Sequence, residues 1–253
     1  MRILWLFGLI IAALIVVAPQ AGVARVFKFD TETFASYFIV NGATTALSDS
    51  PWVLESAATA TDKSYSTVTG GEFGFTYKSK VVSWRFGFEI LKPPKLSEVT
   101  ASQDGTAVYS LASEITGYAP KIGLEISPWS RGNQRAFLFG FFGTASMSVK
   151  NSYTGLAIAP GVDHSVEMAG TGSLTGGGVG YEAHFFDTTT FLIEAGYRML
   201  SIDELNYTKA VTTFSSPGAG TVEPGQAVLK TDGTKRGLDY TGPYVGIGLR
   251  FWL

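Results

Sequence analysis

Apolar and polar positions alternate strictly along the last twelve residues, up to the carboxyl end of the chain. One side of this alternation carries the large apolar groups: Pro243, Val245, Ile247, Leu249, Phe251 and Leu253. The other side carries Gly242, Tyr244, Gly246, Gly248, Arg250 and Trp252. Because successive side chains of a strand point to opposite faces, the segment predicts a strand between hydrocarbon and a polar interior.

The same alternation predicts seven further strands. With the last one, we place them at Phe34–Ala43, Val68–Lys78, Val81–Leu91, Ile115–Ser127, Arg135–Val149, Gly170–Phe186, Thr190–Ile202 and Asp239–Leu253. Short connections are predicted at Ser79–Lys80, Pro128–Gln134 and Asp187–Thr189. Long ones, rich in Ser, Thr, Ala, Gly and Pro, are predicted at Thr44–Thr67, Lys92–Glu114, Lys150–Ala169 and Asp203–Leu238.

This order of connections is that of an even-stranded transmembrane barrel with both termini on one side. The sequence therefore predicts an all-β fold, a closed antiparallel eight-stranded transmembrane β-barrel over residues 25–253. A soluble sandwich or lipocalin-type barrel is the alternative, and the apolar outer face disfavours it. Pro120 falls on that outer face, where its missing N–H predicts a strand end or a bulge.

Charged residues fall on one face of the predicted strands. Phe86 and Phe88, for example, lie opposite Arg85 and Glu89 on the third strand. The lumen is therefore predicted to hold Glu72, Arg85, Glu89, Lys121, Glu125, Glu182, His184, Glu194, Arg198 and Arg250. An eight-stranded barrel is just wide enough for its side chains to fill it, so these charges must be paired. Their near-balance of sign predicts a self-neutralising plug more than a selective pore.

Within this set, the sequence predicts one specific pair. Glu72 and Arg85 flank the Ser79–Lys80 turn on adjacent strands, so we expect them to point inward together.

The amino end of the chain predicts export. Arg2 precedes an apolar run over Ile3–Ala18, and Gly22-Val23-Ala24 supplies the small residues of a cleavage site. We therefore predict a signal peptide over residues 1–24, because the run is shorter than the roughly 20 residues of a membrane-spanning helix.

Composition narrows the chemistry further. The chain has no cysteine, which excludes disulfides, thiolate metal sites and a lipidated cysteine. A net charge of -2 without a basic block argues against nucleic acid as a partner. The 30 glycines and 18 phenylalanines are typical of aromatic-girdled strands around a crowded lumen.

Together these features resemble the small eight-stranded bacterial outer-membrane proteins of the OmpA, OmpX and OmpW type. The resemblance implies residence in the outer membrane, in contact with its lipid and lipopolysaccharide. It also implies that the barrel-assembly machinery reads the closing strand, through Tyr244, Val245, Ile247, Leu249, Phe251, Trp252 and Leu253. Leu253 departs from the terminal phenylalanine of that signal.

The sequence predicts no catalytic, cofactor or metal site. Of its two histidines, His164 lies in the run Asp163-His164-Ser165, whose successive side chains diverge too much for a relay. His184 is expected to be an ion-pair partner beside Glu182. The glycines at 176–178 and 180 lack the Lys-Ser/Thr of a phosphate loop and are expected to make room for large neighbours.

Three functions remain open. The first is a non-enzymatic structural or surface-interaction barrel, whose four long loops, with Trp52 and the Thr212–Gly225 stretch, meet outside molecules. The alternatives are a narrow channel for small or hydrophobic solutes and, third, a lipid-modifying enzyme. One barrel fold serves all of these roles.

Overall fold

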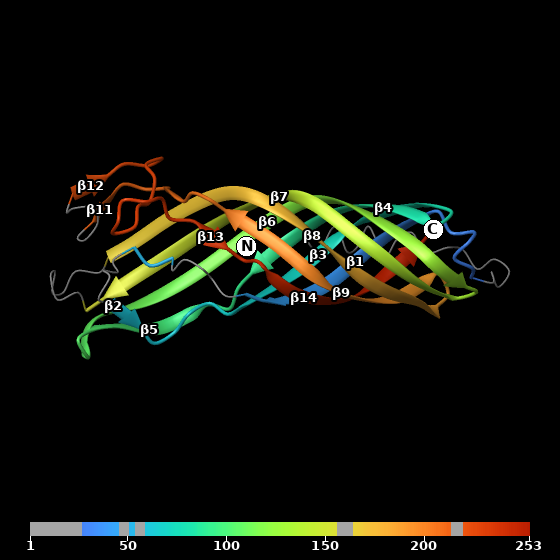
Figure 1. Cartoon of the computed structure of the whole chain (residues 1–253), viewed down its shortest axis with the longest axis horizontal. Helices are drawn as coiled ribbons and strands as arrows, with labels where there is room; N and C mark the ends of the chain where they lie inside the picture. The colour runs from blue at the N-terminus through green and yellow to red at the C-terminus, as the bar shows by residue number, and fades with distance from the viewer. Residues whose placement is uncertain (1–26, 46–50, 54–58, 156–163, 214–219) are drawn as a thin grey trace.

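The computed structural model describes residues 27–45, 51–53, 59–155, 164–213 and 220–253, so the predicted signal peptide lies outside the described residues. Eight antiparallel strands form a ring: β1 (Phe34–Thr44), β3 (Thr67–Ser79), β4 (Val82–Lys92), β6 (Thr106–Arg131), β7 (Gln134–Thr154), β8 (His164–Phe186), β9 (Thr189–Ile202) and β14 (Gly242–Trp252). Each strand pairs with the next in this order, and β14 pairs with β1, which closes the ring (Figure 1). The predicted fold is confirmed.

Three two-residue turns lie at one end of the barrel. They are Lys80–Val81, Gly132–Asn133 and Asp187–Thr188, each bracketed by paired strand residues. Lys80, Gly132 and Asp187 have left-handed backbone angles, with φ of 55°, 60° and 49°, as such tight turns require. The carboxyl end lies at the same end of the barrel (Figure 1). Because short turns are periplasmic in this architecture, we name it the periplasmic end.

The prediction for Pro120 was wrong. Pro120 lies opposite Phe88 in the middle of β6, and the register of β6 on β7 is the same on both sides of it. The bulge is instead between Ile126 and Trp129, around Pro128. β6 continues through this bulge to Arg131, so the predicted Pro128–Gln134 connection is mostly strand.

The strands differ greatly in length. β6, β7 and β8 have 26, 21 and 23 residues, against 11 for β1, β4 and β14. About 9–11 residues of a tilted strand cross a bilayer, so the long strands continue beyond it. There β5 (Leu96–Gln103) and β2 (Thr59–Thr61) extend the sheet on one edge, and β10 (Asn206–Tyr207) on the other. We name this part the extracellular sheet.

The extracellular sheet corrects two loop predictions. Much of Lys92–Glu114 and Lys150–Ala169 is strand, and β5 and β6 form a hairpin over a two-residue Asp104–Gly105 turn. Both turn residues have positive φ, of 51° and 77°, which is the geometry that Asp-Gly favours in hairpins. The Thr44–Thr67 and Asp203–Leu238 connections contain only short strands among their described residues, namely β2, β10, β11 (Val211–Thr213), β12 (Gly220–Val222) and the start of β13 (Leu238–Asp239).

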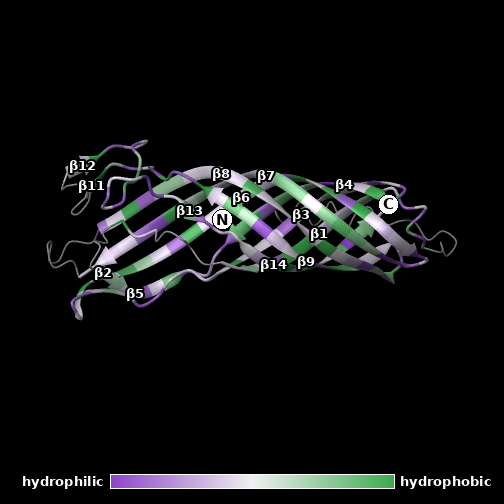
Figure 2. Cartoon of the chain, in the orientation of Figure 1, coloured by the Kyte–Doolittle hydropathy of each residue, from purple (hydrophilic) through white to green (hydrophobic). Residues whose placement is uncertain are grey.

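Hydrophobic and hydrophilic residues alternate along the strands (Figure 2). The face that carries the apolar residues differs between the two halves of the barrel. In the periplasmic half, large apolar side chains such as Phe75, Phe86 and Ile193 are about half exposed on the outside. In the extracellular sheet the inside is apolar, with Leu111, Val149 and similar residues fully buried. The outside there carries mainly Ser, Thr, Lys and Glu. This inversion explains why Lys92–Glu114 and Lys150–Ala169 were predicted to be loops, because outward Ser and Thr residues are also typical of loops.

The last long connection covers the open side of the extracellular sheet. Leu205, Val228 and Tyr240 pack into the same apolar core as the strands, which we name the extracellular core. Trp52 belongs to it and is only 2% exposed. The prediction that Trp52 meets outside molecules was therefore wrong. The part of the chain that the structure describes contains no helix long and apolar enough to cross a membrane.

Candidate functional site

The lumen of the periplasmic half is a network of buried ion pairs. Nine of the ten predicted lumen charges point into it, all except His184. Its carboxylates are Glu72, Glu89, Glu125, Glu182 and Glu194. Its cations are Arg85, Lys121, Arg135, Arg198 and Arg250. Five charges of each sign make this network neutral.

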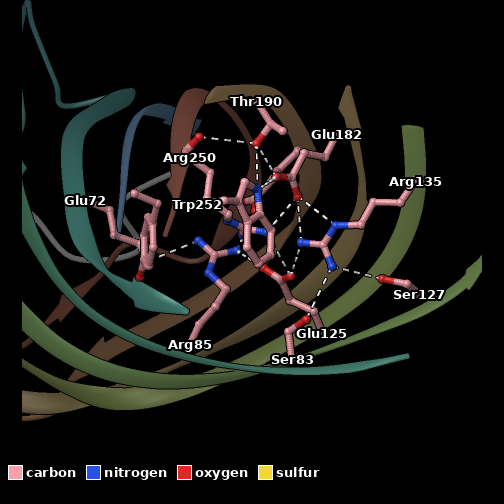
Figure 3. A network of polar contacts seen from close by, with 12 residues as sticks. Glu72, Ser83, Arg85, Glu125, Ser127, Arg135, Glu182, Thr190, Arg250 and Trp252 are labelled. Atoms are coloured by element: carbon pink, nitrogen blue, oxygen red, sulfur yellow. Dashed lines mark hydrogen bonds and ion pairs between the residues drawn. The ribbon is translucent and has the colours of Figure 1, made fainter. Parts of the chain in front are cut away.

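Four of these residues form a closed quartet near the periplasmic end (Figure 3). Arg135 contacts Glu125 at 2.9 Å and Glu182 at 2.6 Å, and Arg250 contacts both carboxylates at 2.7 Å. All four side chains are fully buried. Glu182 also accepts a hydrogen bond of 3.1 Å from the Trp252 indole N–H. Each charge of the quartet therefore has at least two opposite partners.

Two further layers of charge lie above the quartet. In the first, Arg85 contacts Glu194 and lies 3.1 Å from Glu72, so the predicted pair is present. The pair is not exclusive, because Lys121 is 2.8 Å from Glu72 and 2.8 Å from Glu89. In the second layer, Glu89 accepts from Arg198 at 3.1 Å and from Asn41 Nδ2 at 2.9 Å.

The sequence prediction missed Arg135. It begins the fifth predicted strand, and its inward neighbours on β7 are Phe137, Phe139 and Phe141, so that face lacks the polar character expected of a lumen. The Arg135 guanidinium lies 5.1 Å from the Phe137 ring centroid and 5.6 Å from that of Trp252. The predicted lumen set contained five carboxylates and four Arg or Lys residues, and this imbalance was a signal that one inward cation was missing.

His184 is not part of the network, and the prediction for it was wrong. Its Nε2 lies 2.7 Å from the Asp187 carbonyl oxygen, and its ring stacks on Phe27 at 4.8 Å. β8 has an irregular register between His184 and Phe186, next to the turn. The register is still regular at His184, which pairs with the inward Thr190, but at this level of the mouth its ring meets Phe27 and, among the described residues, no carboxylate. Glu182 pairs with Arg135 and Arg250 instead.

Glycines make room for the aromatic side chains of the lumen, as predicted. A Cβ at Gly180 would lie 2.2 Å from the Phe137 ring, and one at Gly176 would lie 2.6 Å from Phe141. A cavity among the charges, lined by Glu72, Arg85, Glu194 and neighbours, has a volume of about 10 Å³. That is about the space that one water molecule needs.

The segment before β1 closes the periplasmic mouth. Phe29 is fully buried against Trp252, at 6.0 Å between ring centroids, and lies under the Arg135 guanidinium. Lys78 Nζ donates to the Phe29 carbonyl oxygen at 2.7 Å, which anchors the segment to β3. The lumen is therefore filled at three levels: aromatic at the mouth, ionic in the middle and apolar in the extracellular core.

His164 and Ser165, which are adjacent in the sequence, are not arranged as a catalytic relay. His164 is buried inside the sheet and Ser165 is exposed on the outside, so the two side chains point to opposite faces of β8. Asp163 lies outside the described residues. Among the described residues, no group of three or more His, Asp or Glu side chains is arranged to hold a metal ion.

No protein-family model matches the chain, and a comparison with curated proteins also finds no match. Solved structures do resemble it. The outer membrane protein OprG from Pseudomonas aeruginosa aligns with a TM-score of 0.50 and 14% identity, over 88% of this chain and 97% of OprG. Ail, the attachment invasion locus protein of Yersinia pestis, aligns with a TM-score of 0.43 and 14% identity, over 87% of this chain and all of Ail. With its closed eight-stranded ring and apolar outer belt, the chain has the fold of the small outer-membrane β-barrel proteins.

Proposed function

We propose that this protein is a non-enzymatic, non-conducting barrel that anchors its extracellular sheet in the outer membrane for contact with molecules outside the cell. The filled lumen carries this proposal. A pore needs a continuous wet path, whereas here fully buried ion pairs and the extracellular core occupy the axis in succession. An ion-selective pore typically has an excess of one sign of charge along its lumen, whereas this network has equal numbers of both signs.

The contact surface is the far end of the extracellular sheet. There Asp104 and Gly105 of the β5–β6 turn are exposed, and so are Thr212 of β11 and Thr221 of β12, which pair with each other. Trp52 and Tyr65 of the first connection are buried beneath them and serve to hold the sheet together. The exposed residues are thus supported by the buried extracellular core.

Planar-bilayer recording on refolded protein tests the closed lumen. We expect no current steps from the wild type over the range of ±100 mV, a voltage at which one charge gains about 2.3 kcal/mol. A water-filled porin recorded in the same bilayer serves as the positive control. Stepwise currents from the wild type would replace the proposal with the narrow-channel alternative.

A loop replacement tests the surface role. Cells that carry a Gly-Ser linker in place of residues 211–222 are compared with wild-type cells for adhesion to plates coated with extracellular-matrix protein. We expect reduced adhesion at equal barrel abundance, and no change for Lys28→Gln at the periplasmic end. Equal adhesion of all three strains would reject the surface role and leave a purely structural one.

A further inference from the structure

A polar pocket lies at the periplasmic rim, beside the segment that closes the mouth of the barrel. It has a volume of about 220 Å³ and lies between the β3–β4 turn, the bulge of β6 and the segment before β1. Its lining residues are Asp30, Lys78, Lys80, Val81, Ser127 and Ser130. None of them belongs to the neutral ion-pair network, so the pocket has its own charge. Two lysines against one aspartate give a formal charge of +1.

The donors of the pocket are positioned by the fold. Lys78 is 4% exposed and uses one N–H on the Phe29 carbonyl oxygen, which leaves two further donors on its ammonium group. Lys80 stands at the tip of the turn, held there by its left-handed backbone. Ser127 Oγ accepts a hydrogen bond of 3.1 Å from Arg135, so its own hydroxyl hydrogen is left to donate elsewhere.

An apolar surface adjoins these donors. Val81, which lines the pocket, is 55% exposed. A residue at the periplasmic rim of a membrane barrel is expected near the level where acyl chains meet their headgroups. Cations and hydroxyls beside exposed apolar groups match a phosphate that is esterified to a lipid better than a free ion.

We propose that this pocket binds the phosphate group of a phospholipid in the periplasmic leaflet. Lys80 and Lys78 supply the charge-assisted hydrogen bonds, the two serine hydroxyls supply neutral ones, and Val81 contacts the start of an acyl chain. Asp30 opposes the anion, so a phosphodiester with one negative charge suits the pocket better than a dianion.

The test is a titration of short-chain phosphatidylglycerol into protein refolded in an uncharged detergent, followed by native mass spectrometry. Lys80→Gln with Ser130→Ala should weaken binding by about tenfold or more, since hydrogen bonds to charged groups have that magnitude. Lys80→Arg should keep the affinity. Lys28→Gln is the matched control, because it removes one exposed positive charge from the same end of the barrel without lining the pocket. Heat-modifiable gel migration confirms that each variant is folded.

Two further ligands separate the possible sources of the phosphate. Diacylglycerol with the same chains should bind at least about tenfold more weakly than phosphatidylglycerol, and equal binding would overturn phosphate recognition. Inorganic phosphate should compete only weakly, and competition at the same concentration as the lipid would overturn the lipid as its source. Equal phosphatidylglycerol affinity of the wild type and the Lys80/Ser130 double variant would overturn the pocket itself.

Discussion

The quartet of Glu125, Arg135, Glu182 and Arg250 permits a double-mutant cycle with a defined expected sign. Glu125→Gln removes contacts of 2.7 Å and 2.9 Å and leaves both arginines to share Glu182. At an effective dielectric constant of 20, a pair of unit charges at 2.7 Å attracts by about 6 kcal/mol, and desolvation of each ion offsets several of these. We therefore expect a net loss of about 3–5 kcal/mol from either Glu125→Gln or Arg250→Gln.

The double variant should lose less than the sum of the two single variants. It retains the neutral Arg135–Glu182 pair, whose atoms are 2.6 Å apart, so no charge is left unpaired. We expect the free energies to fall short of additivity by at least about 1 kcal/mol. Equilibrium urea unfolding in lipid vesicles, followed by tryptophan fluorescence, measures all three values.

The exposed Glu167–Lys209 pair, at 2.8 Å, is the matched control. Its side chains are 26% and 67% exposed, so the same cycle there should give a coupling below about 1 kcal/mol. Strict additivity in the quartet would refute the reasoning, because it would mean that water solvates these charges and the lumen is not dry.

Three further comparisons test the packing of the barrel. Phe86→Arg on the outer belt should cost about 2–4 kcal/mol of unfolding free energy, whereas Ser148→Arg, outward on the extracellular sheet, should be tolerated; equal costs would contradict the inversion of polarity. Gly180→Val should cost about 1–3 kcal/mol by overpacking against the inward aromatic ring, and Gly140→Ala, which faces outward, should cost less than 1 kcal/mol in the same assay. Burial raises the pKa of Tyr65 to about 12, so the stability it contributes is present below pH of about 10 and falls as the pH rises towards 12. Unfolding at several alkaline pH values should show a flatter profile for Tyr65→Phe, and parallel profiles would show that Tyr65 titrates normally.

Alternation alone was enough to predict the ring and nine of the ten inward charges. It works because hydrocarbon outside and water-excluded charge inside impose opposite chemistry on neighbouring residues, as Phe86 and Arg85 show. It failed for Arg135, where aromatic residues occupy both faces of β7. Those inward rings fit because glycines of β8 face them, and such complementarity between strands is invisible within one strand.

The extracellular sheet was less predictable for a different reason. Residues 106–114 and 164–169 alternate too, but with serine, threonine and charge facing water and apolar groups facing inward. A short alternating segment does not reveal which of its faces meets solvent. Only the packing of β6, β7 and β8 against the last connection shows that the apolar faces share one core.

The position of β14 in the chain dictates the order in which the barrel is completed. β14 follows the connection over residues 203–241, which covers the extracellular sheet, and it also carries Arg250 into the quartet. A filled lumen offers no passage, so that connection must cross the bilayer before the seam between β14 and β1 is sealed. Until then the interior holds five carboxylates against four cations. An unfinished barrel is therefore anionic inside, and sealing the seam is the event that neutralises it.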